Sequence, residues 1–426
     1  MRSTEITPEK DGEQVVVAGW VHEVRDLGGL VFIVLRDREG FIQITLPKKV
    51  VDPETFRKAR KVSRESVIMV EGTVKKEDKA PNGFEIIPKK FEILNESSAP
   101  LPLEVTEKVP AELDTRLDNR FMDLRRSKIQ AIFRIKSQIV KSIRDFLYSE
   151  GFIEVQTPKI VSTATEGGTE LFPISYFEKE AFLNQSPQLY KQILMSAGFE
   201  RVLEIGPIFR AEEHNTTRHL NEATSVDIEM SFTDHEGVMK LLERLVAKVY
   251  EDVIQNCEKF LNILELKLEV PEIPFPRITY TSAIEIARKS QEIPWGEDLD
   301  LQALKTIGAE LGGFYFITEW PTKIKPFYVM PFEDEKICKS FDLMYGYIEL
   351  ASGAQREHRY QKLVGSIKAK GLQPESFEFY LKAFRYGMPP HAGWGLGLER
   401  FVMAMLNLSN IREAMLFPRD RTRVSP

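Results

Sequence analysis

Short apolar segments separated by turns constrain the fold of the N-terminal part of the chain most strongly. Five of them are rich in β-branched and aromatic residues, and residues 52–63, between the third and the fourth, have a helical pattern. The five segments span residues 14–24, 30–37, 40–46, 66–76 and 83–94. Five short strands with one helix between the third and the fourth predict an OB-type barrel, although another small β-barrel would fit the same pattern.

The composition limits the class of protein. With 426 residues, of which 42% are hydrophobic and 29% charged, the chain is expected to form two or three globular domains. It has no apolar run as long as a membrane span and no signal peptide at its start, so we expect a cytoplasmic protein. Cys257 and Cys338 predict neither a disulfide framework nor a zinc site. The net charge of −6 argues against non-specific binding of polyanions but permits a locally basic RNA surface.

The pattern changes after a polar link that contains prolines. Apolar residues recur at helical spacing from Ile129 to Leu147, and Gly151 is a plausible helix stop. We therefore predict an OB domain at residues 1–103, a hinge at 104–125 and a larger domain at 126–426.

Strands outnumber strand–helix alternations in the larger domain. Residues 152–161 have the composition of a strand, with Pro158 at a boundary, and a helical region begins near residue 236. Residues 201–213 and 225–234 predict an antiparallel pair, and further strands are expected at 314–320 and 325–331. One face of the second strand of the pair should carry Val226, Ile228, Met230 and Phe232. These features favour an α+β domain on an antiparallel sheet.

The segment from His391 to Leu406 is the most informative for function. Glycine alternates at positions 393, 395 and 397, which removes side chains from one face of a strand and lets a flat ligand lie on the backbone. Arg400 follows at the junction with a predicted helix, where its guanidinium can grip phosphate. This pattern is neither of the common glycine-rich nucleotide loops.

Three segments together identify a family. The glycine strand resembles motif 3 of the class II aminoacyl-tRNA synthetases, residues 209–232 resemble motif 2, and the helix–strand unit that ends at Thr157-Pro158 resembles motif 1. The three occur in the family's order, and the resemblance covers essentially the whole chain. It is closest to aspartyl-tRNA synthetases of the archaeal type, in which an OB-fold β-barrel precedes a class II catalytic domain.

The resemblance implies an ATP site and its metal. Forming an adenylate brings a carboxylate and a phosphate together, so it needs cations around both. Arg210 and Arg400 match the catalytic arginines, and Glu349 and Ser352 match the family's Mg²⁺ ligands. A turn or a bulged strand could bring these two residues, which are three positions apart, to one ion. The positions that match ATP contacts are Arg210, Ala211, Glu212, Arg218, His219, Leu220, Glu349, Gly397, Leu398, Glu399 and Arg400.

Two cations indicate which amino acid is used. A site with both Lys191 and Arg356 would leave the amide of asparagine underpaired, whereas it would satisfy the carboxylate of aspartate. In the asparaginyl enzymes the position of Lys191 is typically apolar. By resemblance, Glu166 receives the α-ammonium of the substrate. The positions that match aspartate contacts are Glu166, Gln188, Leu189, Tyr190, Lys191, Arg210, Ser352 and Arg356.

The barrel is expected to read the anticodon. By resemblance, Phe32 stacks on the central uridine, Gln43 bonds to it, and Arg25 lies nearby. The aspartate and asparagine anticodons differ only in the last base, C against U. Enzymes of this type that reject the asparagine tRNA carry Trp and Lys where this chain has His22 and Pro81. Since Pro81 cannot donate a side-chain hydrogen bond, we expect both tRNAs to be charged.

Other readings stay open at this stage. The enzyme could charge the aspartate tRNA alone, it could be an asparaginyl enzyme of the same fold, or it could be a catalytically silent RNA-binding paralogue. The resemblance also implies a homodimer built through motif 1, and an amidotransferase that takes over the misacylated tRNA.

Overall fold

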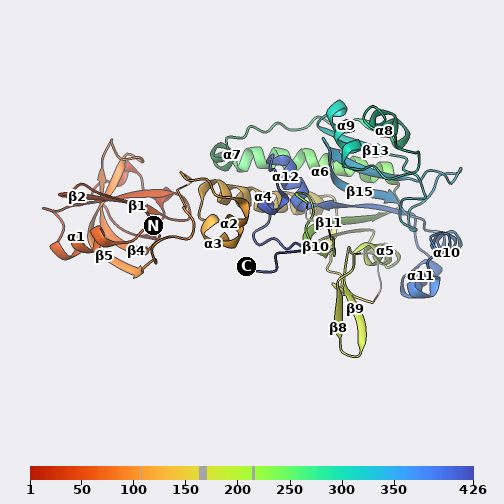
Figure 1. Cartoon of the computed structure of the whole chain (residues 1–426), viewed down its shortest axis with the longest axis horizontal. Coiled ribbons are helices and arrows are strands. Elements are labelled where there is room, and N and C mark those ends of the chain that lie inside the picture. The colour runs from red at the N-terminus through yellow and green to blue at the C-terminus, as the bar shows by residue number, and fades with distance from the viewer. Residues whose placement is uncertain (107, 163–169, 214–215) are drawn as a thin grey trace. The chain divides into compact units, whose positions relative to one another are not determined.

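The chain forms two compact units, residues Met1–Arg126 and Ser127–Pro426 (Figure 1). The computed structural model describes residues 1–106, 108–162, 170–213 and 216–426. Among the helices of these ranges, none carries an apolar stretch of the length that a membrane crossing requires.

The first unit contains a closed five-stranded barrel with the strand order β1-β2-β3-β5-β4. Helix α1 (Pro53–Lys61) connects the third and fourth strands, and the side chain of Asp52 caps its first turn. The predicted OB topology is therefore confirmed. The strands are β1 (Gln14–Asp26), β2 (Leu30–Arg36), β3 (Phe41–Pro47), β4 (Val67–Lys76) and β5 (Phe84–Asn95).

Period-2 patterning builds the barrel core. Val31, Ile33 and Leu35 of β2 are fully buried, so the residues between them face outward. The segment expected to be a hinge contains helices α2 (Leu113–Asp118) and α3 (Arg120–Asp123), which belong to the first unit. Short 3-10 turns precede the barrel at Ser3–Glu5 and Pro8–Lys10.

The second unit is built on an eight-stranded sheet with the order β12-β13-β14-β15-β16-β11-β10-β6. The central pairs are antiparallel, as predicted, whereas the outermost pairs β12–β13 and β10–β6 are parallel. Its strands are β6 (Ile153–Glu154), β10 (Arg201–Phe209), β11 (Glu222–Ser231), β12 (Arg277–Thr279), β13 (Phe314–Thr318), β14 (Ser340–Tyr345), β15 (Ile348–Gln355) and β16 (His391–Gly397).

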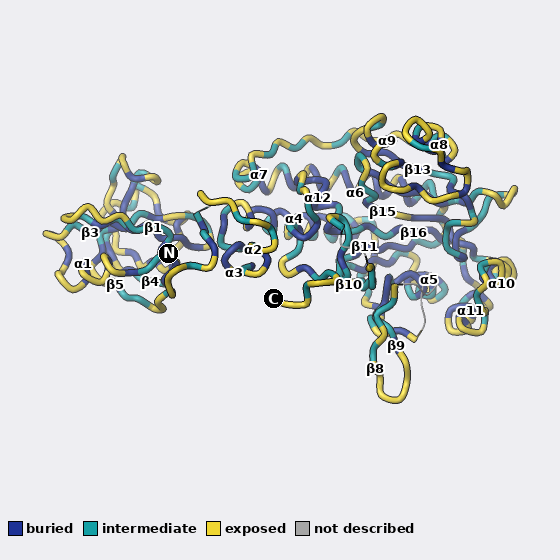
Figure 2. Tube along the Cα trace, viewed as in Figure 1, coloured by how far each residue is buried: buried dark blue, intermediate teal, exposed yellow. Residues whose placement is uncertain are grey.

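Helices surround this sheet, and a small three-stranded sheet projects from it (Figure 1). The small sheet contains β7 (Ile160–Val161), β8 (Pro173–Tyr176) and β9 (Lys179–Leu183), and the β8–β9 hairpin is largely exposed (Figure 2). The helices are α4 (Ser127–Ser149), α5 (Gln188–Ser196), α6 (His235–Asn256), α7 (Glu258–Leu264), α8 (Tyr280–Ala287), α9 (Leu301–Leu311), α10 (Tyr360–Ala369), α11 (Glu378–Arg385) and α12 (Leu398–Met405), with 3-10 turns at Pro374–Phe377 and Ile411–Ala414.

Helical periodicity located the long helices well. Helix α4 covers the predicted helix from Ile129 to Leu147, and both of these residues are buried. The chain turns at Gly151, whose φ of 81° lies in the left-handed region. Helix α6 begins at His235, where the side chain of Asp234 caps it.

Three local predictions were wrong. Residues 325–331 make only isolated bridges and no strand, because Pro326 and Pro331 have no N–H to donate. Phe232 is 72% exposed, because β11 ends at Ser231 and the chain turns at a φ of 57°. The expected strand at 152–161 is divided around Pro158 into β6 and β7, which belong to different sheets.

Candidate functional site

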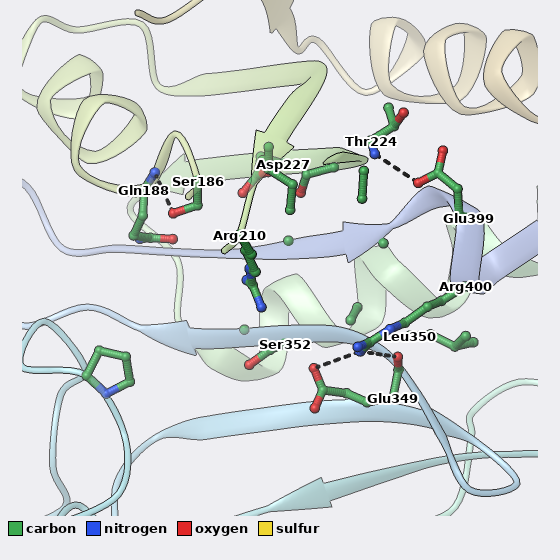
Figure 3. Close-up of a pocket in the computed structure, with 18 of the residues that line it drawn as sticks. Ser186, Gln188, Arg210, Thr224, Asp227, Glu349, Leu350, Ser352, Glu399 and Arg400 are labelled. Atoms are coloured by element: carbon green, nitrogen blue, oxygen red, sulfur yellow. Dashed lines mark hydrogen bonds and ion pairs between the residues drawn. The ribbon is translucent and has the colours of Figure 1, made fainter. Parts of the chain in front are cut away.

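A cavity of about 350 Å³ opens over β11, β15 and β16, beside the start of α12. In Figure 3 the side chains of Arg210, Arg400, Glu349 and Ser352 converge on it. Segments that are far apart in the sequence therefore meet at one place. The predicted site residues that line the cavity are Gln188, Arg210, Glu212, Arg218, His219, Leu220, Glu349, Ser352, Arg356, Gly397, Glu399 and Arg400.

Some predicted residues do not line this cavity. Glu166 lies outside the described residues. The other predicted positions without a place in the cavity lining are Leu189, Tyr190, Lys191, Ala211 and Leu398. Leu189 and Leu398 are instead buried in the apolar core of the unit.

The alternating glycines of β16 serve two purposes. Gly395 and Gly397 line the cavity, as expected for a floor that lets a ligand approach the backbone. Gly393 lies deeper, where a Cβ atom would come within 2.2 Å of Glu229 Oε2. Gly393 is therefore required by its packing against the buried carboxylate of Glu229.

Three arginines stand at one end of the cavity. Arg210 follows the last residue of β10, and its backbone N–H donates to Asn221 O at 3.0 Å. Arg218 stacks over the ring of Tyr347 at 5.7 Å, and Arg400 Nε donates to Arg218 O at 3.4 Å. Burial and the charge of Arg400 lower the pKa of Arg218. This end of the cavity thus concentrates positive charge, which suits a polyphosphate.

His219 lies among these arginines as a neutral ring. Burial, followed by the charges of Arg400, Arg218 and Arg210, lowers the pKa of His219 to about 4. Its Nδ1 lies 2.6 Å from Thr216 Oγ1. At neutral pH His219 can offer a hydrogen bond without adding a further positive charge.

A bulged strand brings Glu349 and Ser352 to the same cavity. Leu343 pairs with Ala351 and Met344 pairs with Glu349, so β15 holds one extra residue at this point. Residues three apart in a regular strand face opposite sides, and the extra residue cancels that alternation. Of the two arrangements expected from the spacing, the bulged strand is present, and both oxygen donors line the cavity.

Asp342 is an acidic neighbour that the sequence analysis missed. It lies directly opposite Ser352 across β14 and β15, and its Oδ2 accepts from Lys325 Nζ at 2.7 Å. Burial raises the pKa of Asp342 to about 6, and the charge of Lys325 opposes this rise. Oδ1 of Asp342 makes no hydrogen bond within the described part of the chain, so it can accept a further ligand. Only the pairing of β14 with β15 shows that Asp342 lies beside Ser352.

The opposite end of the cavity borders a compact network of four charges, of which Asp227 and Arg356 line the cavity itself. Lys191 Nζ lies 2.9 Å from Asp227 Oδ1 and 3.6 Å from Glu229 Oε2. Arg356 Nε donates to Glu229 Oε1 at 2.9 Å, and its Nη2 donates to Gly393 O at 2.9 Å. All four side chains are at least 95% buried. Both cations are therefore held by carboxylates of β11.

Asp227 and Glu229 are functional candidates that the sequence analysis also missed. They alternate with the core residues Val226 and Ile228, and both are buried. Two acidic residues at alternate positions of a buried strand were the available signal, because buried carboxylates need partners. Asp227 also lines the cavity, so it can meet a positively charged substrate group as well as Lys191.

Glu399 is committed to contacts within the protein. Its Oε1 accepts from Lys136 Nζ at 2.7 Å and its Oε2 accepts from Thr224 N at 2.8 Å. Figure 3 shows its carboxylate turned toward Thr224. These bonds fix the first turn of α12 against β11 and α4, and thereby the position from which Arg400 extends.

The barrel gathers the predicted anticodon residues on one outer face. Arg25 of β1 lies opposite Phe32 of β2, and Gln43 of β3 lies opposite Val34, two residues from Phe32. Phe32 is only partly buried, because its neighbours in sequence fill the barrel core. A partly exposed ring with polar neighbours on adjacent strands suits the binding of a single-stranded base.

His22 and the loop that holds Pro81 are linked through Phe41. The ring centroids of His22 and Phe41 are 4.9 Å apart. Asn82, the residue after Pro81, donates from Nδ2 to Phe41 O at 2.7 Å. His22 and the Pro81 loop, the two positions predicted to affect tRNA discrimination, therefore belong to one local cluster around Phe41.

Comparisons with known proteins assign both units. A family model described as "tRNA synthetases class II (D, K and N)" matches residues 112–421, and one described as "OB-fold nucleic acid binding domain" matches residues 15–94. The aspartate–tRNA(Asp/Asn) ligase of Archaeoglobus fulgidus is 71% identical over 100% of this chain and 99% of that protein. The ligase of the same name from Methanocaldococcus jannaschii is 59% identical over 100% of this chain and 97% of its own length.

Solved structures agree on the fold. The asparaginyl-tRNA synthetase of Pyrococcus horikoshii in complex with asparaginyl-adenylate matches with a TM-score of 0.95 and 36% identity, over 100% of this chain and 99% of that one. An aspartyl-tRNA synthetase of Entamoeba histolytica matches with a TM-score of 0.88 and 32% identity, over 100% and 92%. The chain therefore belongs to the class II tRNA synthetases of the D, K and N group, on the branch of the aspartate–tRNA(Asp/Asn) ligases.

Proposed function

We propose that the chain ligates L-aspartate to tRNA through an aspartyl-adenylate and charges both tRNA(Asp) and tRNA(Asn). The observation that carries this proposal is that one cavity has an end rich in arginine and an end lined by Arg356 and Asp227, which are held by Glu229 and Lys191 just outside the lining. The first end suits ATP, and the second suits a small acidic amino acid. The identity with ligases of that name supports the same substrates.

The first step joins aspartate to AMP. The α-carboxylate of aspartate attacks the α-phosphorus of ATP, and pyrophosphate leaves from the opposite side. Arg210, Arg218 and Arg400 line the cavity; Arg210 would stabilise the charge that develops on the α-phosphate, and Arg218 and Arg400 would hold the polyphosphate. In the second step, the terminal ribose hydroxyl of the tRNA takes the aspartyl group and AMP leaves. Since no protein nucleophile is needed, positioning and charge stabilisation provide the rate.

Oxygen donors beside the arginines fit Mg²⁺. Glu349 and Ser352 would hold the ion, and the unsatisfied Oδ1 of Asp342 makes that carboxylate a third candidate. When bound, Mg²⁺ would neutralise phosphate charge and orient the pyrophosphate group. Glu349 Oε1 lies 4.0 Å from Arg400 Nη1, so this carboxylate is close to the cationic end of the cavity.

The amino-acid end favours aspartate through geometry. Arg356 borders the cavity with its guanidinium fixed by Glu229, so its orientation is set before the substrate arrives. Lys191 lies behind Asp227 and holds that carboxylate in place. The amide of asparagine would present its NH₂ to cations at this end, which leaves donors facing donors. Within this fold, an asparaginyl enzyme is the second candidate, favoured by the TM-score of 0.95.

The barrel would bind the anticodon on the face that carries Arg25, Phe32 and Gln43. The cluster of His22 and the Pro81 loop supplies no charged group at those two positions that could distinguish C from U. Replacing His22→Trp and Pro81→Lys together should therefore restore preference for tRNA(Asp). An unchanged ratio of the two charging rates would contradict this part of the proposal.

The outer face of α4 offers a surface for a homodimer. A hollow of about 760 Å³ lies between α4 and residues 415–417, and Tyr148, Leu416 and Phe417 are each about half exposed. An exposed apolar face of this kind fits a two-fold contact with a second copy. An amidotransferase would then convert the aspartate carried by tRNA(Asn), and the enzyme would work in the cytoplasm, where tRNA is used.

Charging of purified tRNAs tests the function. Radiolabelled aspartate should be transferred to tRNA(Asp) and to tRNA(Asn) with kcat/KM values within about tenfold of each other. Charging of tRNA(Asn) that is far slower would indicate an enzyme restricted to tRNA(Asp). Transfer of asparagine instead of aspartate would establish the second candidate.

A further inference from the structure

His22 occupies the extra position of a β-bulge in β1. Val21 pairs with Leu35 and Glu23 pairs with Val34, so His22 has no residue opposite it on β2. Such a bulge redirects the side chain of the extra residue out of the regular alternation. Here it places the imidazole beside the side chain of Arg36, the last residue of β2.

Arg36 determines which ring nitrogen of His22 carries the proton. Arg36 Nη1 lies 3.3 Å from His22 Nδ1. A guanidinium can only donate, so Nδ1 must accept and therefore carries no proton. The single imidazole proton is then on Nε2. Burial and the charge of Arg36 also lower the pKa of His22, which keeps the ring neutral.

A buried ion pair fixes Arg36 in turn. Its Nη1 and Nη2 donate to the two carboxylate oxygens of Glu65 at 3.1 and 2.7 Å, and both side chains are buried. Arg125 also contacts Glu65, at 2.9 Å. Since this pair is bidentate, Arg36 cannot rotate away from His22 without breaking it.

The other ring nitrogen of His22 is available to a ligand. Nε2 makes no hydrogen bond within the described ranges, and His22 is only half-buried. One side of the ring packs on Phe41, which links it to the loop of Pro81. An N–H donor in a fixed orientation therefore stands in the cluster that the proposed function assigns to the last anticodon base.

Cytosine and uracil differ in most of their pairing groups but share one. N3 accepts in cytosine and donates in uracil, and the exocyclic group at C4 donates in cytosine and accepts in uracil. The O2 atom accepts in both. A donor directed at O2 consequently binds either pyrimidine without distinguishing C from U. An acceptor directed at O2 would bond to neither base.

We propose that Arg36 is a positioning residue that fixes His22 as a neutral Nε2–H donor to O2 of the last anticodon base, the acceptor that cytosine and uracil share. The inference rests on the proposed charging of both tRNAs and supplies its physical cause. On this proposal, both tRNAs are accepted because of one defined hydrogen bond from His22. Arg36 then influences tRNA specificity by orienting His22.

Thio-substituted tRNAs test the bond at the base. Transcripts of tRNA(Asp) and tRNA(Asn) would carry 2-thiocytidine or 2-thiouridine at the last anticodon position, because sulfur accepts hydrogen bonds weakly. The kcat/KM for aspartylation should fall by about fivefold for both tRNAs, as expected for one lost hydrogen bond. His22→Phe should cause a similar fall and remove the effect of sulfur. No fall with sulfur, or the same fall in the His22→Phe variant, would overturn the proposal.

Nitrogen-15 NMR of the full chain tests the role of Arg36. The chain has six histidines, so the His22 signals can be assigned by their loss in the His22→Phe variant. The wild-type spectrum near neutral pH should show the Nε2–H tautomer. Arg36→Met should give a mixture of tautomers and unequal kcat/KM values for the two tRNAs, while Arg36→Lys should restore part of the wild-type pattern. If Arg36→Met fails to fold, the wild-type spectrum still decides, since an Nδ1–H tautomer or a cationic ring overturns the proposal.

Failure of this inference can be distinguished from failure of the proposed function. If unmodified tRNA(Asn) is charged far more slowly than tRNA(Asp), the charging of both tRNAs is wrong, and the inference loses its basis. If both tRNAs are charged equally but sulfur has no effect, the proposed function stands and the O2 bond is wrong.

Discussion

The cations at the two ends of the catalytic cavity are held in opposite ways. At the ATP end, Arg218 stacks on Tyr347, and the carboxylate oxygen of Glu349 nearest to Arg400 Nη1 is 4.0 Å away. Burial and the neighbouring Arg400 lower the pKa of Arg218, which shows that positive charges crowd one another there. This end therefore suits a highly charged anion such as a polyphosphate.

At the amino-acid end the charges are matched within the protein. Lys191 and Arg356 each lie 2.9 Å from an oxygen of a buried carboxylate, those of Asp227 and Glu229 respectively. The two cations and two anions cancel in formal charge. We therefore expect the fixed positions of these groups, and not an excess of positive charge, to select aspartate.

The difference follows from what each end must bind. A polyphosphate is large and highly charged, so an excess of positive charge provides affinity. Two amino acids that differ by one oxygen and one NH₂ are separated only by groups held in fixed positions. A buried, fully bonded network provides that rigidity, and its desolvation cost makes it sensitive to the loss of any member.

The largest expected effect comes from the ATP end. Arg210→Ala should lower kcat/KM for aspartate-dependent ATP–pyrophosphate exchange by about 10³-fold, or about 4 kcal/mol, because it removes transition-state charge stabilisation. The free energy of unfolding should change little. Arg385→Ala, which removes an exposed arginine paired with Glu378, is the matched control and should leave exchange unchanged. A loss below tenfold for Arg210→Ala would contradict the role assigned to this residue.

Breaking the network at the other end should affect stability. Glu229→Gln should lower the free energy of unfolding by about 3 kcal/mol, because it leaves Arg356 and Lys191 with one buried carboxylate between them. Chemical denaturation measures this change. Glu251→Gln, at an exposed ion pair with Lys248, should change the free energy of unfolding very little, because solvent screens this pair. Equal losses in the two variants would show that the buried network carries no special weight.

Removing Lys191 and Asp227 separates stability from selectivity. Lys191→Met alone should destabilise the protein and lower the preference for aspartate over asparagine by about tenfold, or about 1.4 kcal/mol. Adding Asp227→Asn removes the unpaired carboxylate and should recover stability but not preference. Exchange rates with each amino acid and denaturation curves give the two readouts. Recovery of preference in the double variant would count against geometric selection.

The smallest effect concerns pH at the ATP end. His219 titrates at about 4 in the folded protein against 6.5 in the unfolded chain, so the unfolded state takes up the proton first as pH falls. The contribution of His219 to stability is therefore complete above 6.5, and it is lost as pH falls from 6.5 to 4. The stability of the wild type relative to His219→Gln should decrease over this range. A difference between the two proteins that does not vary from pH 7 to pH 4 would contradict a neutral, buried ring.

Sequence patterns predicted elements whose periodicity depends on local burial. The barrel strands, α4 and α6 lie where alternation or helical spacing placed them. The prediction at 325–331 failed because its apolar composition resembles a strand, while Pro326 and Pro331 limit pairing to bridges. Phe232 continued the alternation in sequence, but the turn after Ser231 ended it in space.

The site residues also divide into those that the sequence indicates and those that only the packing of distant elements reveals. The family resemblance assigned Arg210, Glu349 and Arg400 to the ATP site, and the structure brings all three to one cavity. It did not reveal Asp227 or Asp342, because the role of each depends on the element packed against it. For Asp342 that is the register of β14 with β15, and for Asp227 it is the approach of α5 to β11.

ATP–pyrophosphate exchange tests the central claim most directly, because it reports the cavity without tRNA. We predict rapid exchange that depends on aspartate and is not supported by asparagine. Exchange driven by asparagine would mean that the charge network selects the amide. No exchange with either amino acid, from a folded protein, would mean that the arginines and carboxylates of this cavity do not form an adenylate.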